Sequence, residues 1–265
     1  MMTTEAAVKQ RLSPSAARAA QLAHLALTPR QEIVLLARAL YREGWDDFEV
    51  GHITYRLPDD TFLTLPFERG WDEVRPEEIL RIDIDGNVLE GDFSVTGAIV
   101  LHLEFHRLRP ECDVTVHQHP RFTTVWSAIG KVPPAYDQRA AYLPDDQIAF
   151  YDDYSGGVNS VDEARAAVNA LGDRSCAILR NHGAFVVANS IAQAFGRATS
   201  LEWRCQQAWH VEAAGGGHEM PQKGRDWLAQ AIAVGCDGAL PHQWPWAVRR
   251  ELRADPALLQ GEGIA

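Results

Sequence analysis

Three histidines have the residue type and spacing that could bind a divalent metal ion. His117 and His119 lie two residues apart at the end of an expected strand, so their imidazoles point to the same face. His182 lies in a tight Asn-His-Gly turn, where histidine is uncommon. Three neutral imidazoles leave positions on Zn²⁺, Fe²⁺ or Mn²⁺ open for substrate, as a catalytic site requires. The alternative is a pair of surface histidines and a turn histidine bonded to local backbone.

The segments around these histidines read as short strands joined by a turn. Residues 113–119 predict a strand that ends at Pro120, and a helix over residues 96–109 precedes it and stops at Pro110. Residues 176–179 and 184–188 predict two apolar strands that flank the His182 turn. The elements mentioned so far must therefore bring distant parts of the chain together if the metal site exists.

The remaining pattern mixes hairpins with helices. A helix is expected from the N-cap Thr28, and further helices at 122–129, from Ser160 to 171, and from Asn189 or Ser190 to 214. Strands are expected at 52–56, 61–65, 80–84 and 88–90, with a loop-like stretch over 130–160 that holds one short strand at 147–151. This order predicts an α/β fold with a mainly antiparallel sheet.

Composition restricts the class of protein. The chain has 265 residues, a formal net charge of −11 and 46% hydrophobic residues, which suits one acidic globular domain. We expect no nucleic-acid or membrane partner, because a basic block and an apolar run of about 18 residues are both absent. The four scattered cysteines and the lack of a secretory signal favour a reduced cytoplasmic protein.

Three segments resemble the class II aldolase/adducin head-domain family: residues 101–110, 114–120 and 178–183. The resemblance extends over residues 28–215, with residues 1–27 left as an N-terminal arm. Residues 216–265 remain as a tail whose Trp227, Trp244 and Trp246 are expected to pack against the domain or a neighbouring subunit. The family resemblance implies a three-layer α/β/α fold, a homotetramer, and a metal bound near a subunit interface. The metal ligands of the family match His117, His119 and His182 in this chain.

The chain departs from the sugar-phosphate aldolases of that family at two places. Those enzymes carry an acid/base glutamate four residues before the helix histidine that matches His102, and Ala98 stands there in this chain. They also hold the substrate phosphate with small polar residues, and the matching stretches 51–54, 65–67 and 96–97 lack most of these donors. The expected substrate is therefore not phosphorylated.

The chain is more similar to the adducin-like branch, which includes decarboxylases and aldolase-fold iron oxygenases. The stretch with Asp137-Gln138, residues 148–151 and residues 153–156 is similar to a Gln-Asp…Phe…Tyr-Gly pattern of that branch. This similarity implies that Gln138 lies near the metal and binds substrate; otherwise it is a surface glutamine. Tyr151 and Tyr154 are candidates to deliver a proton in place of the missing glutamate.

Further histidines have both a functional and a structural interpretation. His102 and His106 share one face of the helix over residues 96–109. His102 is an acid/base candidate or a core histidine, and His106 fits a helix surface or an interface. His52 is a candidate substrate-binding residue or a plain strand histidine. Glu104 lies on another helix face and is not expected to replace the missing glutamate.

Three functions follow from these residues. The leading hypothesis is a metal-dependent lyase that decarboxylates, or cleaves by retro-aldol reaction, a small oxo- or hydroxy-carboxylate, including an aromatic one. The second is an Fe²⁺ oxygenase that cleaves an oxo-acid. The third is a non-catalytic, adducin-like assembly module, which the retained histidines disfavour.

Overall fold

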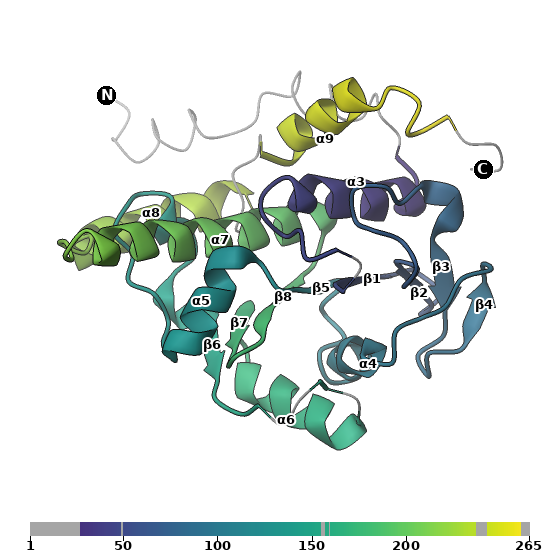
Figure 1. Cartoon of the computed structure of the whole chain (residues 1–265), viewed down its shortest axis with the longest axis horizontal. Helices are drawn as coiled ribbons and strands as arrows, with labels where there is room; N and C mark the ends of the chain where they lie inside the picture. Colours follow the sequence, from purple (N-terminus) through teal and green to yellow (C-terminus); the bar gives the residue numbers. More distant parts are fainter. Residues whose placement is uncertain (1–26, 49, 155–156, 159, 237–242, 261–265) are drawn as a thin grey trace.

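The computed structural model describes residues 27–48, 50–154, 157–158, 160–236 and 243–260, and these contain one eight-stranded sheet (Figure 1). Its strand order is β4-β3-β2-β1-β5-β8-β7-β6. The strands are β1 (His52–Arg56), β2 (Phe62–Thr64), β3 (Leu80–Ile82), β4 (Val88–Glu90), β5 (Val114–Gln118), β6 (Ile148–Tyr151), β7 (Cys176–Leu179) and β8 (Gly183–Ala188). Only β6 and β7 pair in parallel, which confirms the prediction of a mainly antiparallel sheet.

Helices cover both faces of this sheet and give the three layers that the family resemblance implies (Figure 1). One face carries α3 (Pro29–Tyr41) and α7 (Ile191–Ala213), with α9 (Gln243–Ala254) packed on the outer side of these two helices, and the other face carries α4 (Ile99–Leu108) and α6 (Val161–Leu171). Helix α5 (Arg121–Ile129) packs on α7 and on the β7–β8 pair, whereas α8 (Gln222–Cys236) contacts the short 3-10 turn η2 (Ala140–Tyr142). Two more such turns are η1 (Pro76–Glu78) and η3 (Asp145–Gln147).

Apolar side chains fill both interfaces of the sheet, but unequally. A large cluster lies between the sheet and α3, α7 and α9, and includes Val114 and Val116 of β5. On the opposite face two smaller clusters pack under α4 and α6, one around Phe185 of β8 and one around Phe62 of β2. Because the side chains of β5 alternate, Thr115 and His117 face α4, between these two clusters.

Local capping signals define several helix starts as expected from the sequence. Thr28 and Gln31 form a capping box at α3, and Ser160 and Glu163 form another at α6. Ser190, rather than Asn189, caps α7 through its side chain. These caps satisfy backbone donors that no residue inside the helix can reach.

Some predicted boundaries differ from the structure. The helix expected from residue 96 begins at Ile99, because residues 96–98 form a turn in which the Thr96 side chain accepts a hydrogen bond from the Ala98 backbone. His119 lies just beyond the last residue of β5. The loop-like stretch over 130–160 contains η2, η3 and β6, which adds the parallel edge strand. No helix among the described residues is long and apolar enough to cross a membrane.

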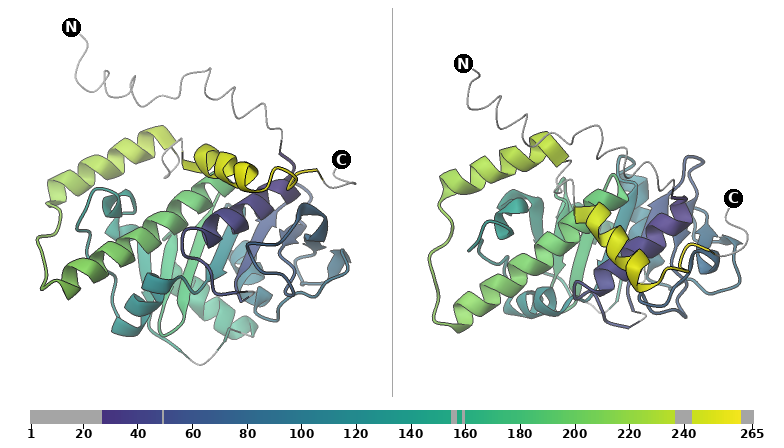
Figure 2. Two further views of the ribbon diagram at one scale, coloured as in Figure 1. Left: turned by 45° about the horizontal axis from the view of Figure 1, so that its top comes forward. Right: turned by 90° about the horizontal axis from the view of Figure 1, so that it is seen from above.

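The C-terminal tail covers the helical layer, as Figure 2 shows from two directions. Helix α9 lies against both α3 and α7, and buried Trp244 packs on Phe195 of α7 with ring centroids 5.7 Å apart. Trp227 and Trp246 are instead about half exposed, at 57% and 47%. Residues 1–26 of the expected N-terminal arm lie outside the described residues.

Replacing Gly183 by alanine is expected to destabilise the fold at the start of β8. An added Cβ would lie 2.5 Å from the Gln118 carbonyl oxygen, which the sheet fixes, and 2.8 Å from a ring carbon of His119, which is bonded to Asp47. Overpacking of this kind lowers the free energy of unfolding by about 1–3 kcal/mol. Thermal unfolding measures the change, and Gly224→Ala in α8 is the control, since its Cβ meets only the flexible Met220 methyl at 3.4 Å. Equal melting temperatures for the two variants would contradict the prediction.

Candidate metal centre

Sheet pairing brings the three predicted metal ligands together. Strand β8 pairs with both β5 and β7, so the turn that carries His182 lies beside the end of β5 that carries His117 and His119. In that turn Asn181 adopts a left-handed conformation with a φ of 50°, which asparagine tolerates better than most residues. One ring nitrogen from each histidine lies within 4.8 Å of the others. The ring centroids are 4.8–5.2 Å apart.

Hydrogen bonds on the far side of two rings determine which nitrogen faces the centre. His117 donates through Nδ1 to the Ala184 carbonyl oxygen at 2.9 Å, and His119 Nδ1 lies 2.7 Å from a carboxylate oxygen of Asp47. A carbonyl or carboxylate partner orients a histidine so that its Nε2 lone pair is left for a metal. His119 Nε2 is buried and has no hydrogen-bond partner among the described residues. An unpaired buried nitrogen at this place fits a divalent metal ion.

Burial keeps two of these imidazoles uncharged. Desolvation lowers the pKa of His117 well below its ordinary value, and neighbouring histidines lower it further. Desolvation and the nearby His119 lower the pKa of His182 to about 4. A neutral imidazole is the form that binds a metal, so little proton release opposes binding near neutral pH. The donor set of three nitrogens suits Zn²⁺ or Fe²⁺ and leaves coordination positions open.

His52 and His102 adjoin this cluster on the face of the sheet that carries α4. His52 lies directly opposite His117 in the β1–β5 register, and their ring centroids are 5.1 Å apart. His102 is fully buried, with Nε2 3.2 Å from His52 Nδ1 and Nδ1 2.6 Å from the Thr115 hydroxyl. His102 therefore lies one hydrogen bond behind His52. The predicted roles of both residues stay predictions.

The other predicted site residues are distributed more widely. Tyr154 is half exposed and its ring lies 6.1 Å from the His182 ring, so it can reach a ligand at the centre. Tyr151 ends β6 and bonds to Asp153, and burial raises the pKa of its hydroxyl. Gln138 is exposed just before η2 and donates to the Tyr142 hydroxyl at 3.3 Å. Its expected place beside the metal is a prediction that this single chain leaves untested.

Helix α4 carries no side chain that takes the place of the absent glutamate. Ala98 stands at the first turn of the helix, and its side chain carries no polar atom. Glu104 is 1% exposed and is committed to Arg107 at 2.6 Å and Arg165 at 3.0 Å, as expected from its different helix face. Helix α4 therefore supplies no carboxylate to the centre, which leaves the imidazoles, a tyrosine hydroxyl or water as candidates for proton transfer.

The sequence did not indicate several groups that lie at the centre. Asp47 lies in the loop after α3, and nothing in its spacing connects it to His119. The Ala184 carbonyl is a backbone group and has no sequence signal. Thr115 could have been found, because it shares the face of β5 with His117 at a spacing of two residues.

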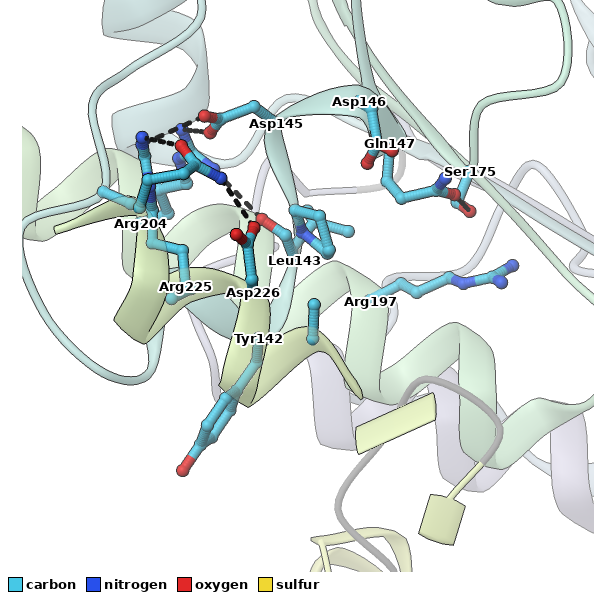
Figure 3. Close-up of a pocket in the computed structure, with 15 residues that line it drawn as sticks. Tyr142, Leu143, Asp145, Asp146, Gln147, Ser175, Arg197, Arg204, Arg225 and Asp226 are labelled. Carbon is cyan, nitrogen blue, oxygen red and sulfur yellow. Dashed lines mark hydrogen bonds and ion pairs between the residues drawn. The ribbon is translucent and has the colours of Figure 1, made fainter. Parts of the chain in front are cut away.

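A separate cavity of about 610 Å³ opens among η2, η3, α7 and α8 (Figure 3). Its buried Arg204 donates to the carbonyl oxygens of Pro133 and Leu143 and pairs with Asp145. Arg225 pairs with the same Asp145. Because its main charges neutralise one another, we assign the chemistry to the histidine cluster.

The fold and the cluster together define an α/β protein with three histidines, at the ends of central strands, that could hold a divalent metal. The chain belongs to the Class II Aldolase and Adducin N-terminal domain family, whose model matches residues 31–209. It is 31% identical over 201 residues to a 3,4-dihydroxyphthalate decarboxylase of Arthrobacter keyseri, covering 71% of this chain and 80% of the relative.

Two further proteins are similar to this chain, one in sequence and one in fold. The chain is 29% identical over 190 residues to the 4-hydroxy-3-prenylphenylpyruvate oxygenase/4-hydroxy-3-prenylbenzoate synthase of Streptomyces roseochromogenus subsp. oscitans, covering 69% of this chain and 68% of that protein. The L-fuculose 1-phosphate aldolase from Glaciozyma antarctica PI12 has a similar fold, with a TM-score of 0.77 and 22% identity, covering 86% of this chain and 90% of that one.

Replacing Asp47 by asparagine is expected to weaken metal binding. The carboxylate orients His119, and removal of such a partner typically costs about 10–100-fold in metal affinity. Competition with a chromophoric chelator measures the affinity. The neighbouring Asp46→Asn variant is the control, because Asp46 pairs with Arg121, whose side chain is 71% exposed. A similar loss in both variants would contradict the role of Asp47.

Removing the metal with a chelator is expected to lower the melting temperature. An ion at about 100 times its dissociation constant stabilises the native state by about 2.7 kcal/mol, which corresponds to roughly 5–10 °C for a domain of this size. Differential scanning calorimetry before and after adding back Zn²⁺ measures the shift. The His182→Ala variant should lose most of the shift, and a full shift in that variant would exclude His182 as a ligand.

Proposed function

We propose that this protein is a metal-dependent carbon–carbon lyase that acts on a small, non-phosphorylated oxo- or hydroxy-carboxylate, with decarboxylation as its main reaction. The observation that carries the proposal is the convergence of His117, His119 and His182. In the described part of the chain this group of ligand atoms consists of imidazole nitrogens alone. Such a set holds a metal and leaves room for a substrate.

A divalent ion in this position supplies a Lewis acid, which stabilises the negative charge left on the substrate when the bond breaks. We assign substrate binding and proton donation to side chains of the protein. His52 lies beside the cluster and can hydrogen-bond the substrate, while Tyr154 can donate a proton to the carbon that loses its carboxylate.

The missing glutamate at Ala98 favours decarboxylation over aldol cleavage. Retro-aldol cleavage requires a base that removes the proton of a substrate hydroxyl, and the aldolases of the family use that glutamate. Loss of CO₂ needs no such base, because the breaking bond leaves its electrons on the substrate without prior proton removal. The name of the Arthrobacter decarboxylase supports the same reaction class and an aromatic acid as substrate.

An Fe²⁺-dependent oxygenase is the second candidate. The same three histidines would hold Fe²⁺, which would supply the activation of O₂ for oxidative cleavage of an oxo-acid. The Streptomyces relative, named as an oxygenase of an arylpyruvate, supports this alternative. For the metal we propose Zn²⁺ in the lyase and Fe²⁺ in the oxygenase, with Mn²⁺ as a substitute.

We also propose a cytoplasmic homotetramer for the assembled protein. The family resemblance implies this state, and it would place residues of a neighbouring chain, such as the exposed Gln138, near the metal. A purely structural, adducin-like role is disfavoured, because the three histidines remain and hydrogen bonds from the rings of His117 and His119 leave the Nε2 atom of each free for a metal.

The proposal predicts release of CO₂ from 3,4-dihydroxyphthalate or a related aromatic acid by the metal-loaded protein, at equal rates in air and under nitrogen. Turnover that stops under nitrogen would establish the oxygenase instead. The His117→Ala variant should lose bound metal and at least about 10³-fold in rate, since a ligand and the Lewis acid are lost together. His218→Ala, which removes an exposed histidine, is the control. Full activity of His117→Ala would contradict both enzyme functions.

A further inference from the structure

A continuous chain of hydrogen bonds crosses the layer between α4 and the sheet and ends at the metal cluster. It joins six groups in this order: the Cys112 carbonyl, His106, Thr54, Thr115, His102 and His52. The successive heavy-atom distances are 3.1, 2.7, 2.5, 2.6 and 3.2 Å. Every side chain in it is at least nine-tenths buried. Each hydrogen in this chain must therefore be placed between partners inside the protein.

The direction of the chain is determined at its far end. The Cys112 carbonyl oxygen can only accept a hydrogen bond, so His106 donates through Nδ1. His106 is uncharged, because burial and the guanidinium of Arg56 lower its pKa to about 3. A neutral imidazole carries one proton, so Nε2 of His106 is a bare acceptor.

The two threonines transmit this direction. Thr54 donates its single hydroxyl hydrogen to His106 Nε2 and can then only accept from Thr115. Thr115 in turn has donated its hydrogen, so it accepts from Nδ1 of His102. Threonine hydroxyls thus act as one-way links, since each has one hydrogen to give.

His102 determines the position of the proton on His52. With its proton on Nδ1, His102 presents a bare Nε2, and the Nδ1 hydrogen of His52 must point to it. The remaining nitrogen of His52, Nε2, then carries a lone pair and no hydrogen. His52 packs against His117 but is not part of the group of three ligand residues.

We infer that His52 is the group that accepts a hydrogen bond from the substrate, and that the substrate must present a hydroxyl group to it. A phosphate or carboxylate oxygen offers only lone pairs to a bare nitrogen and is repelled, whereas a hydroxyl supplies the missing hydrogen. His102 is then a positioning residue that acts through His52. This inference rests on the proposed function, because it takes a small acid bound at the metal as its starting point.

Nuclear magnetic resonance of the full-length protein with ¹⁵N-labelled histidine tests the direction of the chain without any substrate. Protonated and bare ring nitrogens have well-separated ¹⁵N shifts, so the spectrum reports the position of each proton. We expect the proton of His52, His102 and His106 on Nδ1 in all three residues. A proton on Nε2 of His52 would overturn the inference.

A matched pair of threonine variants tests whether the chain transmits this preference. Thr115→Val removes the middle hydroxyl with little change in shape, and we expect His52 to become a mixture of both proton positions. Thr64→Val is the control, because Thr64 lies opposite Thr54 in the β1–β2 register but outside the chain. A His52 spectrum unchanged by Thr115→Val would overturn the transmission through Thr115.

Binding of simple acids to the Zn²⁺-loaded protein tests the substrate class. Isothermal titration compares benzoate with 2-, 3- and 4-hydroxybenzoate in the wild type and in His52→Phe, which keeps a ring against His117. At least one hydroxybenzoate should bind more tightly than benzoate in the wild type, and His52→Phe should reduce that preference about tenfold, the usual effect of one hydrogen bond. Equal preferences in both proteins would overturn the substrate class.

These measurements separate the inference from the proposed function. Proton positions and binding preferences as expected, in a protein that releases no CO₂, would contradict the lyase alone. Decarboxylation by a protein whose His52 carries its proton on Nε2 would contradict the inference alone.

Discussion

Between α4 and the sheet, side chains of histidine and threonine lie between two apolar clusters where water has no access. Burial of this kind makes a charged imidazole costly and an unpaired polar hydrogen nearly as costly. The rings are consequently uncharged, and each hydrogen has one available acceptor. The site depends on this constraint, because neutrality keeps the imidazoles ready for a metal and the hydrogen-bond chain orients His52 beside them.

The metal cluster depends on backbone as much as on side chains. His117 is oriented by the carbonyl of Ala184 on the adjacent strand, and Gly183 allows the turn to approach His119 closely. Asp47 orients His119 from a loop that the sheet does not include. Strand β5, the start of β8 and the loop that carries Asp47 are distant in sequence, and together they position the rings of His117 and His119. The pairing of β5 with β8 limits how far the two strands can move apart.

The chemistry follows from what surrounds this cluster. The family's aldolases combine a metal with a glutamate and a phosphate cradle, and this chain has kept the histidines while Ala98 stands in place of the carboxylate. His52 lies next to His117 in the β1–β5 register, where we propose that it accepts a hydrogen bond from the substrate. A small acid with a hydroxyl group, bound without a phosphate and cleaved with little need for a base, fits both changes.

Much of the architecture is local and could be predicted from the sequence. Short runs of strand-forming residues marked β1, β5 and β8, capping boxes marked α3 and α6, and the two-residue spacing of His117 and His119 indicated a shared face. The parallel pairing of β6 with β7 was beyond prediction, because it joins residues far apart in the chain. The same holds for Asp47 and for the hydrogen-bond chain from Cys112 to His52, which arise only when α4 is laid across β1 and β5. Residue types thus determined that a metal could bind, while the tertiary structure decided the direction of the hydrogen bonds from Cys112 to His52, since that direction depends on which acceptors burial leaves within reach.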